Sequence, residues 1–210
     1  MTGQLLPQSS QDRPLVSVIM NCYNSDEFLK DAIDSIYCQS YQNWEIIFWD
    51  NQSNDNSSKI FKSYNDKRFK YFLSDNHTLL YEARNKAIEK SNGELISFLD
   101  VADVWLNNKL ELQVPLLNNK NISLVYANCY TVNQFKYKTK LFKSNLPTGF
   151  ILDELIIKYV VALPTILIRK TVFDKMHVLV MQDYVFHLCF VEQTEFISHR
   201  RLAMEPVESC

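Results

Sequence analysis

The sequence predicts an α/β protein in which a mostly parallel sheet carries helices on both faces. Short apolar runs, rich in β-branched and aromatic residues, alternate with segments of helical apolar spacing throughout residues 15–100. This alternation is typical of crossover units whose successive strands are parallel. Two of the runs end on an aspartate, at Asp50 and Asp100. Open α/β sheets bind their ligands at the carboxyl ends of the strands, so both aspartates are candidate site residues.

Four strands and three helices are expected in the first half of the chain. The expected strands are residues 15–20, 45–50, 69–73 and 95–100. The first helix begins near Asn24, whose spacing to Glu27 resembles a capping box, and has an apolar face over residues 28–37. A second helix is expected to begin near residues 55–56, and a third spans residues 79–91.

The pattern weakens after residue 100. A helix is expected over residues 106–117, with an end or a kink at Pro115, and a strand over residues 124–132. Less regular candidates follow: helices over 151–159 and 182–191, and an added strand over 164–168. Residues 192–210 carry little pattern, and no second domain boundary is visible. We therefore expect one domain over residues 1–210, with a loose arm at 1–13.

Residues 133–145 are polar and rich in lysine, which predicts a loop or a hairpin. The lysines are Lys136, Lys138, Lys140 and Lys143. The simplest interpretation is a solvated loop. The other interpretation is a surface that meets an anionic acceptor or a membrane.

Composition narrows the possible functions. The net charge of −2 gives no electrostatic reason to expect nucleic-acid binding. Only three glycines occur, so a glycine-rich phosphate loop is absent. No apolar run reaches the roughly 18 residues of a spanning helix, and residues 1–13 lack the apolar centre of a signal peptide. A cytoplasmic location is the default expectation.

The aspartates that follow the strands suggest a ligand site. A carboxylate resists burial unless it is paired or holds a metal. Asp50, Asp100 and Asp103 therefore indicate a site for a sugar, a nucleotide or a divalent cation. Simpler alternatives stay open: Asp50 as the cap of a turn, Asp103 as the cap of the next helix, and Arg84 in a surface ion pair.

Several ordered blocks resemble the family 2 glycosyltransferases, which have the GT-A fold. The blocks are residues 16–24 (Val-Ser-Val-Ile-Met-Asn-Cys-Tyr-Asn), 32–36, 39–41, 44–57 with Asp-Asn-Gln-Ser-Asn-Asp-Asn-Ser at its end, 83–85 (Ala-Arg-Asn), 93–94, 98–105 and 109–111. No single block is specific, but their order over about ninety residues is. The resemblance fades after about residue 133. It implies that residues 15–132 bind a nucleotide sugar and that residues 133–210 form an acceptor-side part, shorter than usual.

The resemblance implies a donor site. In the family, the turn after the first strand and the Asp at the end of the second hold the base, which assigns Cys22, Tyr23 and Asp50. The Arg of Ala-Arg-Asn lies near the base and diphosphate, which suggests Arg84. Asp100 begins the Asp-x-Asp motif, which spans the ribose and a metal ion.

The resemblance also implies the chemistry. A Mg²⁺ or Mn²⁺ ion on the diphosphate would be held by Asp100 and Asp103, since hard cations prefer oxygen ligands. Asp183 stands where the family has its catalytic base, which takes a proton from the acceptor hydroxyl during one inverting displacement. The expected partners are a nucleotide-diphosphate-sugar donor, probed first as UDP-linked, and a glycan or lipid-linked acceptor. Cell-surface polysaccharide synthesis, in the cytoplasm or at the inner face of the membrane, is the implied process.

Three residues depart from the family pattern, and each departure removes negative charge. Ala102 replaces the second Asp of Asp-x-Asp, Asn51 replaces an acid, and Gln182 replaces the Glu before the catalytic Asp. A methyl group cannot coordinate a cation. The alternative hypothesis is therefore a catalytically impaired protein of the same fold that binds a nucleotide sugar or a partner.

Overall fold

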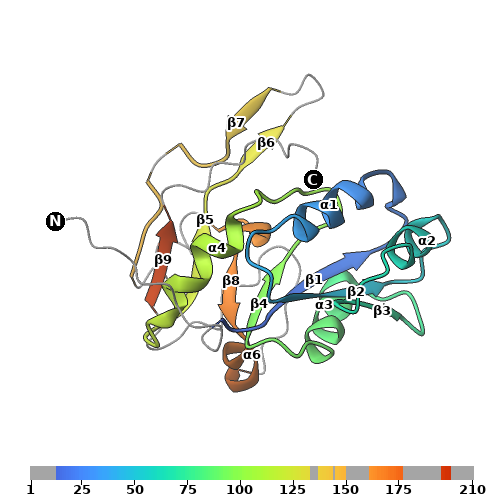
Figure 1. Cartoon of the computed structure of the whole chain (residues 1–210), viewed down its shortest axis with the longest axis horizontal. Coiled ribbons are helices and arrows are strands. Elements are labelled where there is room, and N and C mark those ends of the chain that lie inside the picture. Colours follow the sequence, from blue (N-terminus) through green and yellow to red (C-terminus); the bar gives the residue numbers. More distant parts are fainter. Residues whose placement is uncertain (1–12, 133–136, 144, 150–160, 177–194, 200–210) are drawn as a thin grey trace.

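A seven-stranded sheet forms the centre of the computed structural model (Figure 1), which describes residues 13–132, 137–143, 145–149, 161–176 and 195–199. The strands are β1 (Val16–Cys22), β2 (Trp44–Asp50), β3 (Phe69–Leu73), β4 (Leu95–Phe98), β5 (Ile122–Ala127), β8 (Leu167–Arg169) and β9 (Glu195–His199). Their order is β3-β2-β1-β4-β8-β5-β9. All neighbouring pairs are parallel except those of β8, which runs antiparallel to β4 and β5. The predicted mostly parallel sheet is confirmed.

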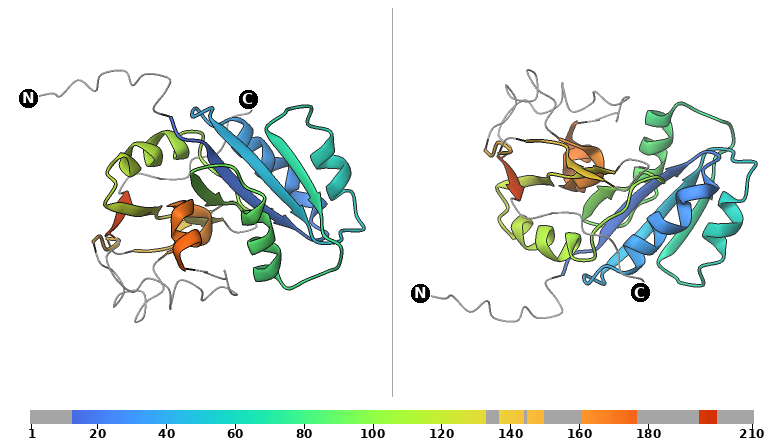
Figure 2. Two further views of the ribbon diagram at one scale, coloured as in Figure 1. Left: turned by 90° about the horizontal axis from the view of Figure 1, so that it is seen from below. Right: turned by 90° about the horizontal axis from the view of Figure 1, so that it is seen from above.

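Helices cover both faces of the sheet (Figure 2). The helices are α1 (Asp26–Tyr37), α2 (Ser57–Lys62), α3 (Leu80–Glu89), α4 (Lys109–Gln113) and α6 (Lys170–Met176), with short 3-10 turns η1 (Val114–Asn118) and η2 (Leu163–Thr165). One half of the core packs α1, α2 and α4 against the sheet, and the other packs α3 and α6. None of the helices in the described ranges has the length and apolarity that crossing a bilayer requires.

The pleat of the strands divides the core between the two faces. Val18 and Met20 of β1 face α1, whereas Ile19 faces α3. The register pairs Cys22 with Asp50, so β1 and β2 end side by side. Because β4 is parallel to β1, its carboxyl end lies at the same edge of the sheet.

A buried carboxylate joins the strands at the opposite edge. Glu45 accepts hydrogen bonds from Ser17 Oγ (2.6 Å) and from the backbone N–H of Asn92 (2.7 Å), and its other oxygen lies 2.6 Å from Lys70 Nζ. The N–H of Gly93 donates to Ser17 Oγ at 2.8 Å. A Cβ on Gly93 would lie only 2.6 Å from Ser17 N, so glycine is required where this loop crosses β1.

The expected elements up to residue 100 are confirmed, with small shifts at their ends. The capping box is wrong: Ser25 precedes α1 without a side-chain cap, and Asn24 adopts φ 48° and accepts a hydrogen bond from Asn54 N at 2.8 Å. Pro115 does end the helix before it, since α4 gives way to the 3-10 turn η1.

The strand expected over residues 124–132 is two strands. β5 ends at Ala127, and β6 (Tyr130–Val132) pairs antiparallel with β7 (Lys138–Lys140) in a separate hairpin. The expected strand at 164–168 is the turn η2 followed by β8, while α6 and β9 were not expected from the sequence. The helices expected over 151–159 and 182–191 lie outside the described residues.

Candidate functional site

Asp50 ends β2 as a buried carboxylate with a partner on each oxygen. The backbone N–H of Ser53 donates to Oδ1 at 2.8 Å, and the Tyr71 hydroxyl on β3 donates to Oδ2 at 2.6 Å. Asp50 therefore caps the turn after β2, as the simpler interpretation expected. Each carboxylate oxygen can accept more than one hydrogen bond, so the cap leaves capacity for a ligand N–H. Burial, followed by the hydrogen bond to Asp50, raises the pKa of Tyr71 to about 12, which keeps its hydroxyl a donor.

Cys22 and Tyr23 follow one another at the end of β1 but face different surroundings. Cys22 is buried, and burial is the main reason that the pKa of its thiol is raised. Its role is packing rather than nucleophilic chemistry. Tyr23 is half exposed, and its ring centroid lies 4.2 Å from that of His77, tilted by 54°. The pair presents aromatic surface beside the end of β2.

Asn51 ties the loop after β3 to the end of β2. Its Nδ2 donates to Thr78 O at 2.7 Å, and its Oδ1 accepts from Thr78 N at 3.1 Å and from Thr78 Oγ1 at 3.2 Å. The Asn51 carbonyl lies 2.9 Å from His77 Nδ1. A carboxylate could not donate to Thr78 O, so an amide suits this position better than the acid of the family pattern.

Gln52 supports the same loop. It has φ 72°, a conformation that favours glycine, and it stands where the family block has glycine. Its Nε2 donates to the carbonyl of Ser74, whose own N–H donates to Asp50 O at 2.9 Å. The side-chain hydrogen bond offsets the backbone strain. His77 was not identified from the sequence, because its position depends on this tertiary loop.

Arg84 and Asp100 meet between α3 and the end of β4. Ile96 and Phe98 of β4 face α3, and Asp100 follows them at the same two-residue spacing. Arg84 Nη2 lies 3.0 Å from Asp100 Oδ1, and only 4% of the Arg84 side chain is exposed, against 45% for Asp100. The sequence left open a surface ion pair for Arg84. The structure instead places a buried guanidinium against the half-exposed carboxylate at the predicted ligand edge.

Asp103 lies beside Asp100, one turn further along the chain. Its backbone N–H donates to Asp100 O at 2.9 Å. Burial raises the pKa of Asp103 to about 6, and the charge of Asp100 adds to that shift. The charge of Asp103 in turn raises the pKa of the Cys129 thiol, second to burial. β5 runs parallel to β4, because both are antiparallel to β8, so the segment after β5 begins at the same edge of the sheet as Asp100.

The two aspartates fit a divalent cation only with ligands from elsewhere. No set of three His, Cys, Asp or Glu side chains with metal-binding geometry occurs among the described residues. Mg²⁺ commonly binds one or two carboxylates and takes its other ligands from substrate phosphates and water. Asp100 and Asp103 satisfy that requirement, and a cation would relieve the repulsion between them.

The segment from Asp103 to Lys109 is fixed by the core. Trp105 is buried and donates from Nε1 to Pro164 O at 2.8 Å, so it is a core residue. Lys109 is also buried, with Nζ 3.0 Å from Ser97 Oγ and 3.9 Å from the Trp105 ring centroid. Burial lowers the Lys109 pKa well below its ordinary value. Asp183 and Gln182 lie outside the described residues.

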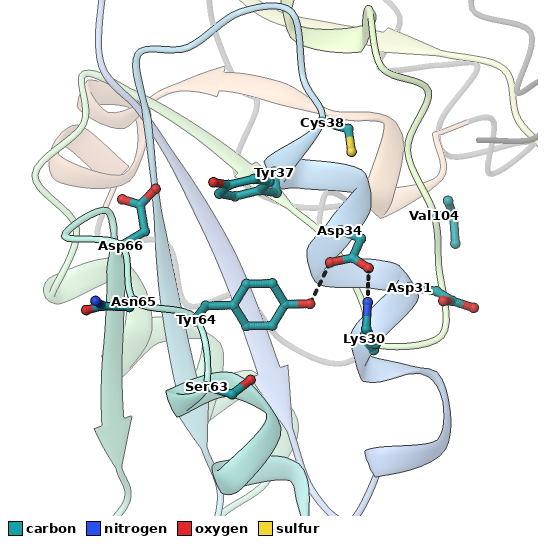
Figure 3. A pocket seen from close by; sticks show the side chains of 10 residues that line it. All are labelled: Lys30, Asp31, Asp34, Tyr37, Cys38, Ser63, Tyr64, Asn65, Asp66 and Val104. Atoms are coloured by element: carbon teal, nitrogen blue, oxygen red, sulfur yellow. Dashed lines mark hydrogen bonds and ion pairs between the residues drawn. The ribbon is translucent and has the colours of Figure 1, made fainter. Parts of the chain in front are cut away.

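A cavity of about 860 Å³ lies between α1 and the segment after α2 (Figure 3). Asp34 projects into it from α1, accepts a hydrogen bond from the Tyr64 hydroxyl at 2.6 Å and forms an ion pair with Lys30. None of the predicted site residues lines it. Val104, which follows Asp103 in the chain, does line it.

The sheet and the aspartates at its carboxyl edge have the arrangement of the GT-A fold. The profile of the glycosyl transferase family 2 matches residues 17–177. The chain therefore belongs to glycosyl transferase family 2.

Two curated relatives are bacterial glycosyltransferases by name. The chain is 36% identical over 122 residues to the UDP-Glc:alpha-D-GlcNAc-diphosphoundecaprenol beta-1,3-glucosyltransferase WfgD of Escherichia coli, covering 58% of this chain and 48% of the relative. It is 32% identical over 117 residues to the putative teichuronic acid biosynthesis glycosyltransferase TuaG of Bacillus subtilis, covering 55% and 46%. The chain spans about half the length of these relatives.

Solved structures share the fold at low identity. Staphylococcus aureus TarS 1-349, in complex with UDP-GlcNAc, superposes with a TM-score of 0.73 at 18% identity, covering 92% of this chain and 60% of that one. The mannosyltransferase PcManGT of Pyrobaculum calidifontis, in complex with GDP-Man and Mn²⁺, has a TM-score of 0.69 at 14% identity, covering 91% and 56%. At these identities the likeness shows the fold alone.

Proposed function

We propose that this chain is a single GT-A domain of an inverting glycosyltransferase that moves a sugar from a UDP-linked donor to a glycan or lipid-linked acceptor. The observation that carries the proposal is the grouping of Asp50, Arg84 and Asp100 at the carboxyl edge of a GT-A sheet. The names of the two curated relatives support cell-surface polysaccharide synthesis as the process. The inner face of the cytoplasmic membrane is the proposed place of action.

The proposed base site lies between β1 and β2. Asp50 accepts the imide N–H of uracil, while Tyr71 and Ser53 hold its carboxylate in position. Tyr23 provides an aromatic face for the base, and Cys22 packs beneath the turn. Aromatic stacking favours any base, so the hydrogen bond to Asp50 supplies the preference for a base that offers an N–H.

The proposed diphosphate site lies between α3 and β4. Arg84 is proposed to act beside the diphosphate by orienting the exposed carboxylate of Asp100. Asp100 and Asp103 would hold Mg²⁺ or Mn²⁺, which neutralises charge on the departing diphosphate when bound. Asp183 is proposed to take the proton from the acceptor hydroxyl. The proposed division is a donor part at residues 15–132 and an acceptor-side part at residues 133–210.

One observation favours the alternative of an impaired protein with the same fold. Ala102 leaves Asp100 and Asp103 as the carboxylates of this turn. Burial raises the pKa of Asp103 and the charge of Asp100 adds to that shift, so two charged carboxylates without a cation are unfavourable here. If the cation binds too weakly, the chain would hold a nucleotide sugar without transferring the sugar.

A transfer assay separates the two functions. The purified chain is incubated with Mn²⁺, a panel of UDP-sugars and a diphosphate-linked lipid carrying GlcNAc, and UDP release and glycolipid product are measured. We expect transfer that Asp183→Asn abolishes without loss of UDP binding. A matched variant, Asp75→Asn, changes an exposed carboxylate outside the proposed machinery and should transfer at the wild-type rate. UDP binding without transfer from any donor would favour the impaired protein.

A further inference from the structure

Positive charge is concentrated in one continuous part of this acidic chain. Residues 112–152 contain five lysines and no aspartate or glutamate, although the whole chain has a net charge of −2. Lys138 and Lys140 lie on β7, and Lys143 follows three residues later; all three are exposed. The surface that they form therefore has a local charge opposite to that of the protein.

Large apolar side chains are exposed on the same element. Tyr137 is 71% exposed, Val132 60% and Leu141 44%. These residues flank or belong to β6 and β7, which form their own two-stranded sheet and project beyond β5 in Figure 1. Exposed apolar residues scattered singly need no explanation, but three on one small hairpin with lysines between them do.

The base of this hairpin is firmly joined to the body. Asn128 Nδ2 donates to Phe142 O at 2.7 Å, and its Oδ1 accepts from Phe142 N at 3.1 Å. The N–H of Leu141 donates to Cys129 O at 2.8 Å. The exposed surface is therefore carried on an ordered element with a fixed attachment.

The attachment lies beside the proposed diphosphate site. β5, which leads into the hairpin, runs parallel to β4 because both are antiparallel to β8, so the foot of the hairpin lies at the same edge of the sheet as Asp100. A molecule that rests on the hairpin is thus held next to the edge at which Asp100 and Asp103 lie.

We propose that the hairpin formed by β6 and β7, extended to Lys143, docks the chain on an anionic lipid bilayer. Lysines are drawn to the negative surface of such a membrane, and tyrosine and aliphatic side chains enter its interface. A soluble anionic glycan would use the lysines but gives no reason for the exposed Val132, Tyr137 and Leu141. The proposed docking is argued from these side chains alone. Its purpose, to bring a lipid-linked acceptor to the donor site, rests on the proposed function.

Vesicle binding tests the proposal without donor, metal or acceptor. The full chain is sedimented with phosphatidylcholine vesicles with and without phosphatidylglycerol, at low salt and at about 0.5 M NaCl. We expect binding to the anionic vesicles only, weakened by salt. The double variant Lys138→Glu with Lys140→Glu should bind at least about tenfold more weakly. Tyr137→Ser should weaken binding at both salt concentrations, because it removes apolar contact rather than charge.

A matched variant controls for net charge. Lys67→Glu with Lys86→Glu makes the same charge change at exposed residues of the α2–β3 turn and α3 and should leave vesicle binding unchanged. Equal binding to neutral and anionic vesicles would overturn the proposal, as would equal losses in the two double variants. Binding to soluble heparin but not to vesicles would assign the surface to a glycan and also overturn it. Circular dichroism confirms that each variant is folded.

Discussion

Arg84 and Asp100 form an ion pair of 3.0 Å in which the guanidinium is buried and the carboxylate is nearly half exposed. The asymmetry matters, because a buried charge needs its partner, whereas an exposed carboxylate is free to use its other oxygen on a ligand. The pair therefore presents Asp100 at the edge of the sheet while fixing its direction.

Asp100→Asn tests this arrangement. We expect UDP affinity in the presence of Mn²⁺ to fall at least about tenfold, since the amide neither attracts a cation nor balances Arg84. The free energy of unfolding should fall by about 1–3 kcal/mol, because Arg84 stays buried without a countercharge. Calorimetric titration and urea denaturation measure the two effects. Glu89→Gln alters an exposed carboxylate near the end of α3 and should change neither; unaltered UDP binding by Asp100→Asn would remove Asp100 from the site.

Tyr71→Phe tests whether the hydroxyl positions Asp50 for the base. The change removes one hydrogen bond to the carboxylate and keeps the ring. We expect UDP affinity to fall severalfold and the free energy of unfolding to fall by about 1 kcal/mol. Tyr64→Phe is matched, since that hydroxyl donates at 2.6 Å to Asp34, which is not one of the proposed site residues. It should lose similar stability with no loss of UDP affinity; equal losses of affinity in both variants would contradict a role for Tyr71 in positioning Asp50.

Asn51→Asp restores the acid of the family pattern and is expected to harm this chain. The carboxylate cannot donate to Thr78 O and places a charge against that carbonyl. Stability should fall by about 1–3 kcal/mol, and amide exchange at Thr78 should accelerate. Asn54→Asp, the same change at an exposed residue of the next turn, serves as the control. A more stable Asn51→Asp protein would show that the amide does not clamp the loop.

Glu45→Gln tests the carboxylate at the far edge of the sheet. Burial alone would raise its pKa, but hydrogen bonds from Lys70, Ser17 and Asn92 lower it below the ordinary value of 4.5. A lowered pKa means that the stabilisation is complete above pH 4.5 and is lost as the pH falls through the folded-state pKa. We expect the variant to be about 1–3 kcal/mol less stable at pH 7 and the difference to shrink below pH 4.5. Urea denaturation across that range checks the sign, and a difference that does not depend on pH would contradict it.

The positions of the strands and their terminal aspartates could be predicted from the sequence, because burial on both faces produces continuous apolar runs that end where ligands bind. The cap of α1 could not be predicted, because the Asn24 side chain accepts a hydrogen bond from the backbone N–H of Asn54 in another loop. The role of Asn51 could not be predicted either. The sequence shows only that an amide replaces an acid, whereas its hydrogen bonds to Thr78 depend on how the loop after β3 folds. β9 pairs with β5 across about seventy residues, a contact that no local pattern indicates.

Titration of the purified chain with UDP, with and without Mn²⁺, tests the central claim most directly, and it is repeated on Ala102→Asp. Two carboxylates and the diphosphate suffice for a cation, so we predict saturable binding by the natural chain that Mn²⁺ tightens by about tenfold or more. The added carboxylate of Ala102→Asp should tighten it further. Metal-dependent binding by Ala102→Asp alone would mean that the natural chain has lost its cation site. Absence of UDP binding in both forms would contradict the donor site at Asp50, Arg84 and Asp100.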